Sequence, residues 1–357
     1  MAENRTDFPR YRADGRSPVV AVHGGQSRRD ARVLIAALAV LAGALVLALT
    51  VNGMRLSPDS YEYMSTAADI TTVGGIPVTY SWWPPLQPLI LAPFEDMQAA
   101  ARWLNALCLA GTVALTLTAL RRHSVWILIG VGAALMLSPA LQFVHQWVWS
   151  EPLFVLHVAA WFALLASEVE TQRRIALLGL VAALLGLQRY VGILFVPLGL
   201  FALLLARARW QPLMLYAFTA SVPPGIWLLR NILLGYPASG LDRGAAYFSF
   251  FKATEAAILT GISWVPMLAL VFVLGALTSV RFSRSLLVVC AYYVIGHTVF
   301  IIWSASSTSM DGPDQRLLAP VVVPLVYGML ALGGQMALLR QRKGLNGDHA
   351  KDEVVSV

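Results

Sequence analysis

Long hydrophobic runs, separated by short polar turns, extend along almost the whole chain. Each run approaches the ~20 residues that an α-helix needs to cross the ~30 Å hydrocarbon core of a membrane. We therefore predict an all-α polytopic membrane protein with about ten transmembrane helices, at residues 32–51, 100–120, 124–141, 151–167, 174–188, 190–206, 211–229, 257–280, 285–303 and 316–339.

The polar stretches divide the chain into three parts. Residues 1–31 form a basic tail that we expect to be disordered, 32–340 form the membrane domain, and 341–357 form a second polar tail that we also expect to lack structure. Within the domain, the loop 52–99 follows the first predicted helix. Its prolines interrupt helical structure, so we expect short helices that lie along the membrane interface.

The composition agrees with this architecture and excludes an ordinary soluble domain. Hydrophobic residues make up 58% of the chain and charged residues 13%, with a mean hydropathy of +0.67. Both cysteines, Cys108 and Cys290, fall inside apolar runs, where a buried thiol behaves as a small hydrophobic group. No disulfide framework is therefore expected.

The distribution of positive charge predicts the orientation of the helices. If the N-terminus is cytoplasmic, nineteen of the 26 Lys and Arg residues lie in segments that face the cytoplasm, as the positive-inside rule requires. Both termini are then cytoplasmic, and the loop 52–99 is extracytoplasmic. The net charge of +7 thus reflects membrane topology, and we expect no nucleic-acid partner because no base-stacking or groove-reading motif accompanies it.

Asp59 begins a predicted helix in the extracytoplasmic loop. Ser57 is a suitable N-cap, and Pro58 suits the first helical position. Glu62 and Tyr63 follow Asp59 at spacings that share one helical face. Two interpretations remain at this point, because Asp59 can act as a base or can only stabilise the positive end of the helix dipole.

Glu151 begins the fourth predicted span, directly after Ser150, which we expect to cap the helix. A carboxylate so near hydrocarbon normally faces a wet cavity or a cation, which favours a functional site or an ion pair. His145 and His157 flank Glu151, but without the compact spacing of metal ligands on one helix face. We expect no metal and no cofactor.

Three arginines, Arg189, Arg230 and Arg316, lie at the predicted outer boundary, where the positive-inside rule depletes them. A single arginine there can simply extend to the interface. Three on one side favour an anionic ligand such as a phosphate, which the guanidinium fork matches. The candidate substrate-binding residues are Glu62, Tyr63, Glu151, Arg189, Tyr190, Arg230, Asp314 and Arg316.

These motifs, taken in order, resemble the GT-C superfamily of integral membrane glycosyltransferases. The similarity is strongest to its protein-mannosyltransferase-like and lipid-A aminoarabinose-transferase-like branches, and it covers residues 32–340. The motifs are Asp-Ser-x-x-Tyr from Asp59, Trp-Pro-Pro-x-x-Pro from Trp83, Ser-Glu-Pro-Leu-Phe from Ser150, Arg-Tyr-x-Gly from Arg189, Arg-Asn from Arg230 and Arg-x-Leu-x-Pro from Arg316.

The resemblance implies a polyprenyl-phosphate-linked sugar donor in a bacterial cell envelope. It implies that Asp59 is the catalytic base and that Arg189, Arg230 and Arg316 hold the donor phosphate. Two features depart from the family pattern. The soluble C-terminal domain of many members is not in this sequence, and Asp59 is not part of an Asp-x-Asp pair, which disfavours a metal-dependent mechanism.

The expected reaction transfers the sugar to a hydroxyl of a glycan, lipid or protein acceptor, with inversion of the anomeric centre. A transporter or flippase for a polyprenyl-linked or other anionic lipid is the main alternative, because a basic cavity that faces outward suits the transport of such a lipid as well as catalysis. Transporters often contain internal repeats, and none is evident here. A noncatalytic scaffold in envelope assembly, with Asp59 only ending a helix, is a third interpretation.

Overall fold

The computed structural model describes residues 28–80, 83–167, 171–238, 244–278, 280, 282–309 and 312–352, with only the backbone of Arg28 and of 340–352. Helices form throughout this part of the chain, and it contains no strand. They are α1 (Arg28–Leu49), α2 (Pro58–Val73), α3 (Leu86–Leu91), α4 (Met97–Ala119), α5 (Val125–Met136), α6 (Pro139–Val144), α7 (Glu151–Ala166), α8 (Gln172–Gln188), η1 (Tyr190–Leu194), α9 (Phe195–Leu205), α10 (Trp210–Leu233), α11 (Phe250–Ile262), α12 (Val265–Thr278), α13 (Arg284–Ser307), α14 (Gln315–Leu318), η2 (Ala319–Val321) and α15 (Val322–Asp352).

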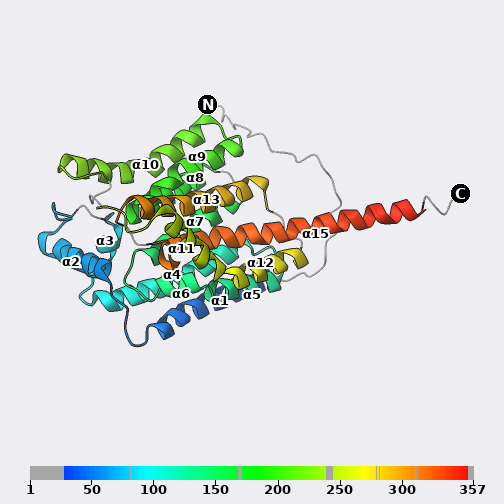
Figure 1. The fold of residues 1–357 in the computed structure, drawn as a ribbon, viewed down its shortest axis with the longest axis horizontal. Coiled ribbons are helices and arrows are strands. Elements are labelled where there is room, and N and C mark those ends of the chain that lie inside the picture. The colour runs from blue at the N-terminus through cyan, green and yellow to red at the C-terminus, as the bar shows by residue number, and fades with distance from the viewer. Residues whose placement is uncertain are drawn as a thin grey trace, which may run out of the picture.

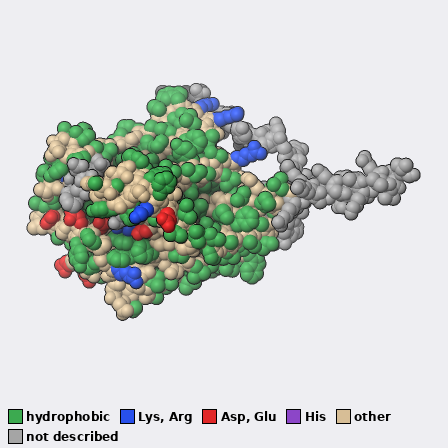
Figure 2. Space-filling view, viewed as in Figure 1, with side chains coloured by type: hydrophobic (Ala, Val, Ile, Leu, Met, Phe, Trp, Pro, Cys, Tyr) green, Lys and Arg blue, Asp and Glu red, His purple; other side chains and the backbone are tan. Residues whose placement is uncertain are grey.

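The long helices run roughly side by side, with α2 and α3 at one end of the bundle and the C-terminal part of α15 leaving at the other (Figure 1). The main pairs are α1 with α4, α4 with α7, α8 with α10, and α12 with α15. Hydrophobic side chains dominate the surface shown in Figure 2, whereas Asp and Glu gather toward the end that carries α2 and α3. A mostly apolar surface is what a bundle embedded in lipid presents.

The predicted spans coincide with helices or with broken pairs of helices, which confirms the all-α polytopic architecture. By length and composition, five of the described helices can cross a membrane, or six if the pair α11 and α12, bent by 54°, counts as one span. Val125–Met136, Glu151–Ala166 and Tyr190–Leu205 are apolar but shorter. The count of ten crossings, like the interfacial position of the helices in the loop 52–99, stays a prediction.

Two boundaries differ from expectation. The run 124–141 is not one helix, because Ser138 and Pro139 end α5 and start α6. At the C-terminus, α15 continues as a helix to Asp352, so the expectation of a tail without structure is wrong for 341–352. The N-terminal tail up to residue 27 lies outside the described residues.

The turns predicted to face the cytoplasm meet at one end of the bundle. Leu165, Arg174, Ala206 and Phe282, which lie at or beside three such turns, line one cavity. The ring of His123, from a fourth turn, lies 6.1 Å from that of Phe282. The turns predicted to face outward meet at the other end of α7, where the charged residues lie.

A charged network at the end of the bundle

Four charged side chains from separate segments form a chain of alternating charges. Arg316 of α14 pairs with Asp59 of α2 through Nη2, and with Glu151 of α7 through Nε. Glu151 Oε1 also pairs with Nη1 of Arg189, which lies between α8 and η1. Segments more than 250 residues apart in the sequence thus meet at one site.

The four side chains of this network differ in burial, and this difference determines how strongly each depends on its ionic partners. The side chain of Glu151 is 1% exposed and that of Arg316 is 9% exposed, whereas Arg189 and Asp59 reach 17% and 24%. Glu151 therefore depends on its two guanidinium partners to offset its loss of hydration. Asp59 is the member of the network that solvent or a ligand reaches most easily.

The N-terminus of α2 presents Asp59, and its capping is as the sequence predicted. Ser57 Oγ accepts the backbone N–H of Ser60, and Ser60 Oγ accepts that of Ser57, which forms a reciprocal capping box. Pro58 occupies the first turn. Because Ser57 already caps the helix, the carboxylate of Asp59 is available to pair with Arg316.

Two side chains fix the short helix that carries Arg316. Asp314 Oδ1 accepts the backbone N–H groups of Arg316 at 2.9 Å and Leu317 at 3.1 Å. The buried side chain of His297 from α13 donates through Nε2 to the carbonyl of Leu317 at 2.9 Å, while Tyr293 Oη donates to its other ring nitrogen at 3.4 Å. Asp314 thus acts on the backbone beside Arg316, and His297 is a contact that the sequence did not indicate.

Ser150 connects the network to α2 instead of capping α7. Its hydroxyl accepts hydrogen bonds from Oη of Tyr63 and Nη1 of Arg189, both at 3.2 Å. The same hydroxyl donates to Oε2 of Glu151 at 3.4 Å. The expectation that Ser150 caps α7 is wrong, because its side chain makes no capping bond. Burial raises the pKa of the Tyr63 hydroxyl well above its usual value, so Tyr63 is a neutral donor at physiological pH.

An aromatic stack supports the guanidinium of Arg316 from one side. Its central carbon lies 4.2 Å from the ring centre of Trp149, which stacks on Trp147 with centroids 4.6 Å apart. Trp149 Nε1 donates to Ser57 Oγ at 2.7 Å, and the central guanidinium carbon of Arg55 lies 5.9 Å from the ring centre of Trp147. The stack therefore joins the position of Arg316 to the capping residue of α2.

The backbone turn at Arg189 depends on a close approach that requires glycine. A Cβ atom on Gly192 would lie 2.1 Å from the carbonyl oxygen of Leu185, so a larger residue would displace the turn. Next to it, buried Gln188 donates to Gln87 Oε1 at 2.9 Å and to the Ser150 carbonyl at 3.0 Å. The glycine of the Arg-Tyr-x-Gly motif thus has a steric role.

The structure does not bring Arg230 into the ion-pair network. Its guanidinium donates to the carbonyls of Tyr80 at 2.8 Å and Pro77 at 2.7 Å, and lies 4.6 Å from the ring centre of Trp227. The expectation of three clustered arginines is therefore met by Arg189 and Arg316 only.

Two other candidates also lie outside the network. Tyr190 Oη accepts from Trp227 Nε1 at 3.2 Å and from Asn231 Nδ2 at 3.3 Å. Glu62 is half-buried and has no ion pair among the residues that the structure describes. Within the same residues, no group of three or more His, Cys, Asp or Glu could hold a metal ion.

The fold and this network define a class of protein: a polytopic helical membrane protein with a half-buried carboxylate, a buried carboxylate and two guanidinium groups at one end of its bundle. Among solved structures, the chain is similar to ArnT from Cupriavidus metallidurans bound to undecaprenyl phosphate, with a TM-score of 0.60 and 17% identity over 86% of this chain. The same protein in the apo state gives a TM-score of 0.58 and 17% identity, again over 86% of this chain.

The likeness concerns the fold. The chain spans 60% of the length of the first ArnT structure and 59% of the second. No protein-family model and no curated protein matches the sequence. The resemblance to an aminoarabinose-transferase-like membrane protein, predicted from the motifs, is thus confirmed at the level of architecture.

Proposed function

We propose that this protein transfers a sugar from a polyprenyl-phosphate-linked donor to an acceptor hydroxyl, with inversion of the anomeric centre. The observation that carries the proposal is the Asp59–Arg316 ion pair, joined through Glu151 to Arg189. It combines a candidate base with candidate phosphate ligands on the fold of ArnT, whose solved complex contains undecaprenyl phosphate.

Asp59 is the proposed general base. The acceptor hydroxyl attacks the anomeric carbon and must lose its proton as the new bond forms, and a carboxylate within hydrogen-bond reach accepts it. Asp59 is the more exposed of the two carboxylates in the network. Glu151 is enclosed by two arginines, and we assign it to holding them in position.

Arg316 and Arg189 are the proposed ligands of the donor phosphate. The leaving group is a lipid phosphate, which departs with the electron pair of the glycosidic bond and gains negative charge. Guanidinium groups stabilise that charge without a general acid. Arg230, which lies apart from the ion pairs, is proposed as an outlying contact of the same donor.

The charge balance suggests how donor and base act together. Two carboxylates and two guanidinium groups make the network formally neutral, so a donor phosphate that engages Arg316 competes with Asp59 for it. We expect the phosphate to take over part of this contact and to leave Asp59 free for the acceptor. Donor binding would then prepare the base for the reaction.

The test uses purified full-length protein, a polyprenyl-phosphate donor with a radiolabelled sugar, and extracts of envelope glycans, lipids and proteins as acceptors. The expected result is transfer of label to an acceptor, with release of polyprenyl phosphate. Movement of intact donor across a liposome bilayer without cleavage would instead identify a flippase. If neither cleavage nor movement of the donor is observed, a scaffold role is the interpretation that is left and the proposal is refuted.

A further inference from the structure

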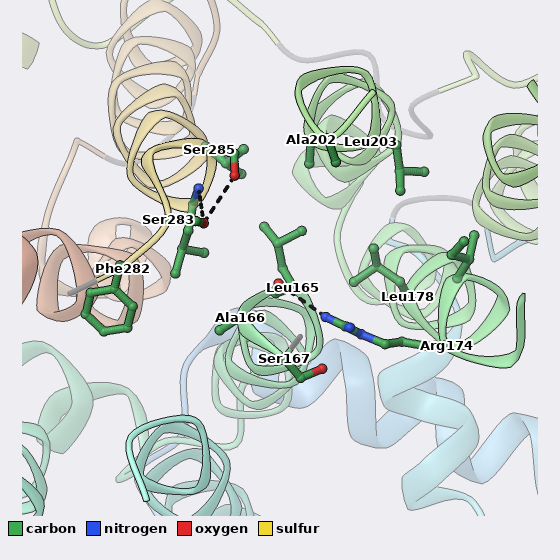
Figure 3. Close-up of a pocket in the computed structure, with 14 residues that line it drawn as sticks. Leu165, Ala166, Ser167, Arg174, Leu178, Ala202, Leu203, Phe282, Ser283 and Ser285 are labelled. Atoms are coloured by element: carbon green, nitrogen blue, oxygen red, sulfur yellow. Dashed lines mark hydrogen bonds between the residues drawn. The ribbon is translucent and has the colours of Figure 1, made fainter. Parts of the chain in front are cut away.

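Tyr80, which precedes α3, and Gln188, at the end of α8, each present a buried polar atom beside the charged network. Tyr80 is 5% exposed and Gln188 is 1% exposed. Among the residues that the structure describes, the Tyr80 hydroxyl and Gln188 Oε1 have no hydrogen-bond partner. Both lie at the network end of the bundle, away from the cavity beside Arg174 (Figure 3). Because a buried polar atom without a partner is costly, such atoms suit a site that a polar ligand completes.

The neighbours of the Gln188 amide fix its orientation. Its Nε2 donates to Gln87 Oε1 at 2.9 Å and to the Ser150 carbonyl at 3.0 Å. A carbonyl oxygen can only accept a hydrogen bond, so the nitrogen of the amide must face Ser150, and Oε1 takes the other position. The unpartnered atom of Gln188 is therefore an acceptor, and it requires a donor such as a hydroxyl group.

Backbone and ring contacts hold Tyr80 against α10. Its carbonyl accepts a hydrogen bond from Arg230 at 2.8 Å, and its ring centre lies 6.2 Å from that of Trp227. Burial raises the pKa of its hydroxyl well above the usual value, and the nearby hydroxyl of Tyr63 and carboxylate of Glu62 raise it further. The hydroxyl of Tyr80 is thus neutral, lies toward α2, and can donate or accept a hydrogen bond.

Tyr63 and Ser150 connect the surroundings of the two atoms. Tyr63 Oη donates to Ser150 Oγ at 3.2 Å, and the carbonyl of the same serine accepts from Gln188. Beside Tyr63 on α2, Glu62 adds a half-buried carboxylate, which is a further acceptor. Two acceptors and one neutral hydroxyl suit a ligand that carries several hydroxyl groups. They do not suit a phosphate, whose ionised oxygens only accept hydrogen bonds.

We propose that Tyr80 and Gln188 bind hydroxyl groups of the sugar that the donor lipid carries, with Glu62 as a third contact. This inference rests on the proposed function and names the part of the site that recognises the sugar. Asp59 is one turn of α2 from Glu62, which places the sugar beside the proposed base. Arg189 directly follows Gln188, which places the phosphate beside one of its proposed ligands.

The test measures lipid binding to the purified full-length protein, by displacement of a fluorescent undecaprenyl phosphate. The probes are undecaprenyl phosphate itself and undecaprenyl phosphates that carry mannose, glucose or arabinose. Wild-type protein should bind at least one sugar-bearing lipid more tightly than undecaprenyl phosphate. Tyr80→Phe keeps the ring and removes the hydroxyl. It should weaken binding of that sugar-bearing lipid roughly tenfold, as expected for one hydrogen bond, and leave the affinity for undecaprenyl phosphate unchanged.

Thermal unfolding gives a second readout that a structural role would not produce. Because the Tyr80 hydroxyl has no partner in the described part of the chain, Tyr80→Phe should not lower the unfolding temperature of the protein without ligand. Gln188→Met should also weaken binding of the sugar-bearing lipid, but should lower the unfolding temperature because two buried hydrogen bonds are lost. Tyr61→Phe is the matched control. Tyr61 lies on α2 and is 61% exposed, so its variant should have wild-type affinities.

Three results would overturn the inference. The first is equal affinity of the wild type for undecaprenyl phosphate and for every sugar-bearing lipid. The second is equal affinity of wild type and Tyr80→Phe for the sugar-bearing lipids. The third is equal weakening of both kinds of lipid by Tyr80→Phe, which would assign the hydroxyl to the phosphate.

These binding measurements separate the inference from the proposed function. If wild-type protein transfers a sugar and Tyr80→Phe binds the sugar-bearing lipid as the wild type does, only the sugar subsite is refuted. If Tyr80→Phe selectively weakens binding of the sugar-bearing lipid and the wild type transfers no sugar, the subsite stands and the proposed transfer is refuted.

Discussion

Asp59 is the residue whose substitution separates a catalytic role from a structural one. Asp59→Asn keeps the size of the side chain and removes the base, so transfer should fall by at least 10²-fold, in the range of general-base contributions. The Ser57 capping box does not involve Asp59, and the variant should therefore fold. Labelled-donor turnover and thermal unfolding of the purified variant measure the two effects separately.

Asp69→Asn is the matched control for this experiment. Asp69 lies on the same helix, is exposed, and has no ion pair among the described residues. Its variant should retain wild-type turnover. Near-normal turnover by Asp59→Asn would remove the catalytic assignment, and equal losses in both variants would point to a general disturbance of α2.

Glu151 should matter for stability as much as for activity. Glu151→Gln leaves Arg189 and Arg316 without their shared buried counter-charge, and breaking a buried pair in this way costs about 3–5 kcal/mol. We expect a clear fall in the unfolding temperature, with partial recovery when undecaprenyl phosphate is added, because its phosphate supplies the missing negative charge. An unchanged unfolding temperature would contradict the proposed role of Glu151.

For single residues, the sequence indicated which charged side chains are candidates for the site but not which of them contact one another. Asp59 stood out because Glu62 and Tyr63 share its helical face, and Glu151 because a carboxylate is expensive beside hydrocarbon. Arg189 and Arg316 stood out because the positive-inside rule depletes arginine at the outer boundary. Arg230 met the same criterion, yet its partners are carbonyl oxygens that no side-chain pattern reveals. Ser150 was predicted to be a cap, and its hydrogen bonds to Tyr63 and Arg189 were not foreseen because both partners are distant in sequence.

At the scale of elements, α14 shows how a helix of four residues holds a charged side chain in place. So short a helix has little stability of its own, because nucleation fixes several residues for a single hydrogen bond. Asp314 accepts the N–H groups of Arg316 and Leu317, and His297 binds the carbonyl of Leu317, one residue before the helix ends. We infer that both are positioning residues for Arg316.

His297→Gln and His297→Leu test this inference as a pair. Glutamine can place a donor near the Leu317 carbonyl, whereas leucine fills the space without one, and a lost buried hydrogen bond costs about 1–3 kcal/mol. We expect His297→Leu to raise KM for the lipid donor roughly tenfold, the lower part of that range, and His297→Gln to recover most of the loss. Equal KM values for both variants and wild type would refute the positioning role.

The hydrophobic pattern predicted the helices well but not their interruptions. Helix period and apolar length are local properties, so α1, α4, α10 and α13 could be placed within a few residues. The bend between α11 and α12 depends on packing and is not visible in an apolar run. Likewise, nothing in the His297 segment signals that its side chain reaches another helix.

At the scale of the whole molecule, the two ends of the bundle differ in chemistry. One end carries the network around Asp59, and the other carries the cavity around Arg174. The count of Lys and Arg residues predicted that the turns beside the network and the turns beside the cavity lie on opposite sides of a membrane. The structure separates the two groups of turns by the length of α7. Which end faces the cytoplasm remains a prediction from the positive-inside rule.

Single introduced cysteines can decide the orientation. The native residues Cys108 and Cys290 are both buried, so a membrane-impermeant maleimide should label the wild-type protein weakly. Ser65 on α2 and Ser167 at the end of α7 are exposed and lie at the two ends of the bundle. In intact cells, Ser65→Cys should react and Ser167→Cys should react only after permeabilisation, because the reagent does not cross the membrane. The reverse pattern would place Asp59 in the cytoplasm, where an extracytoplasmic acceptor could not reach it.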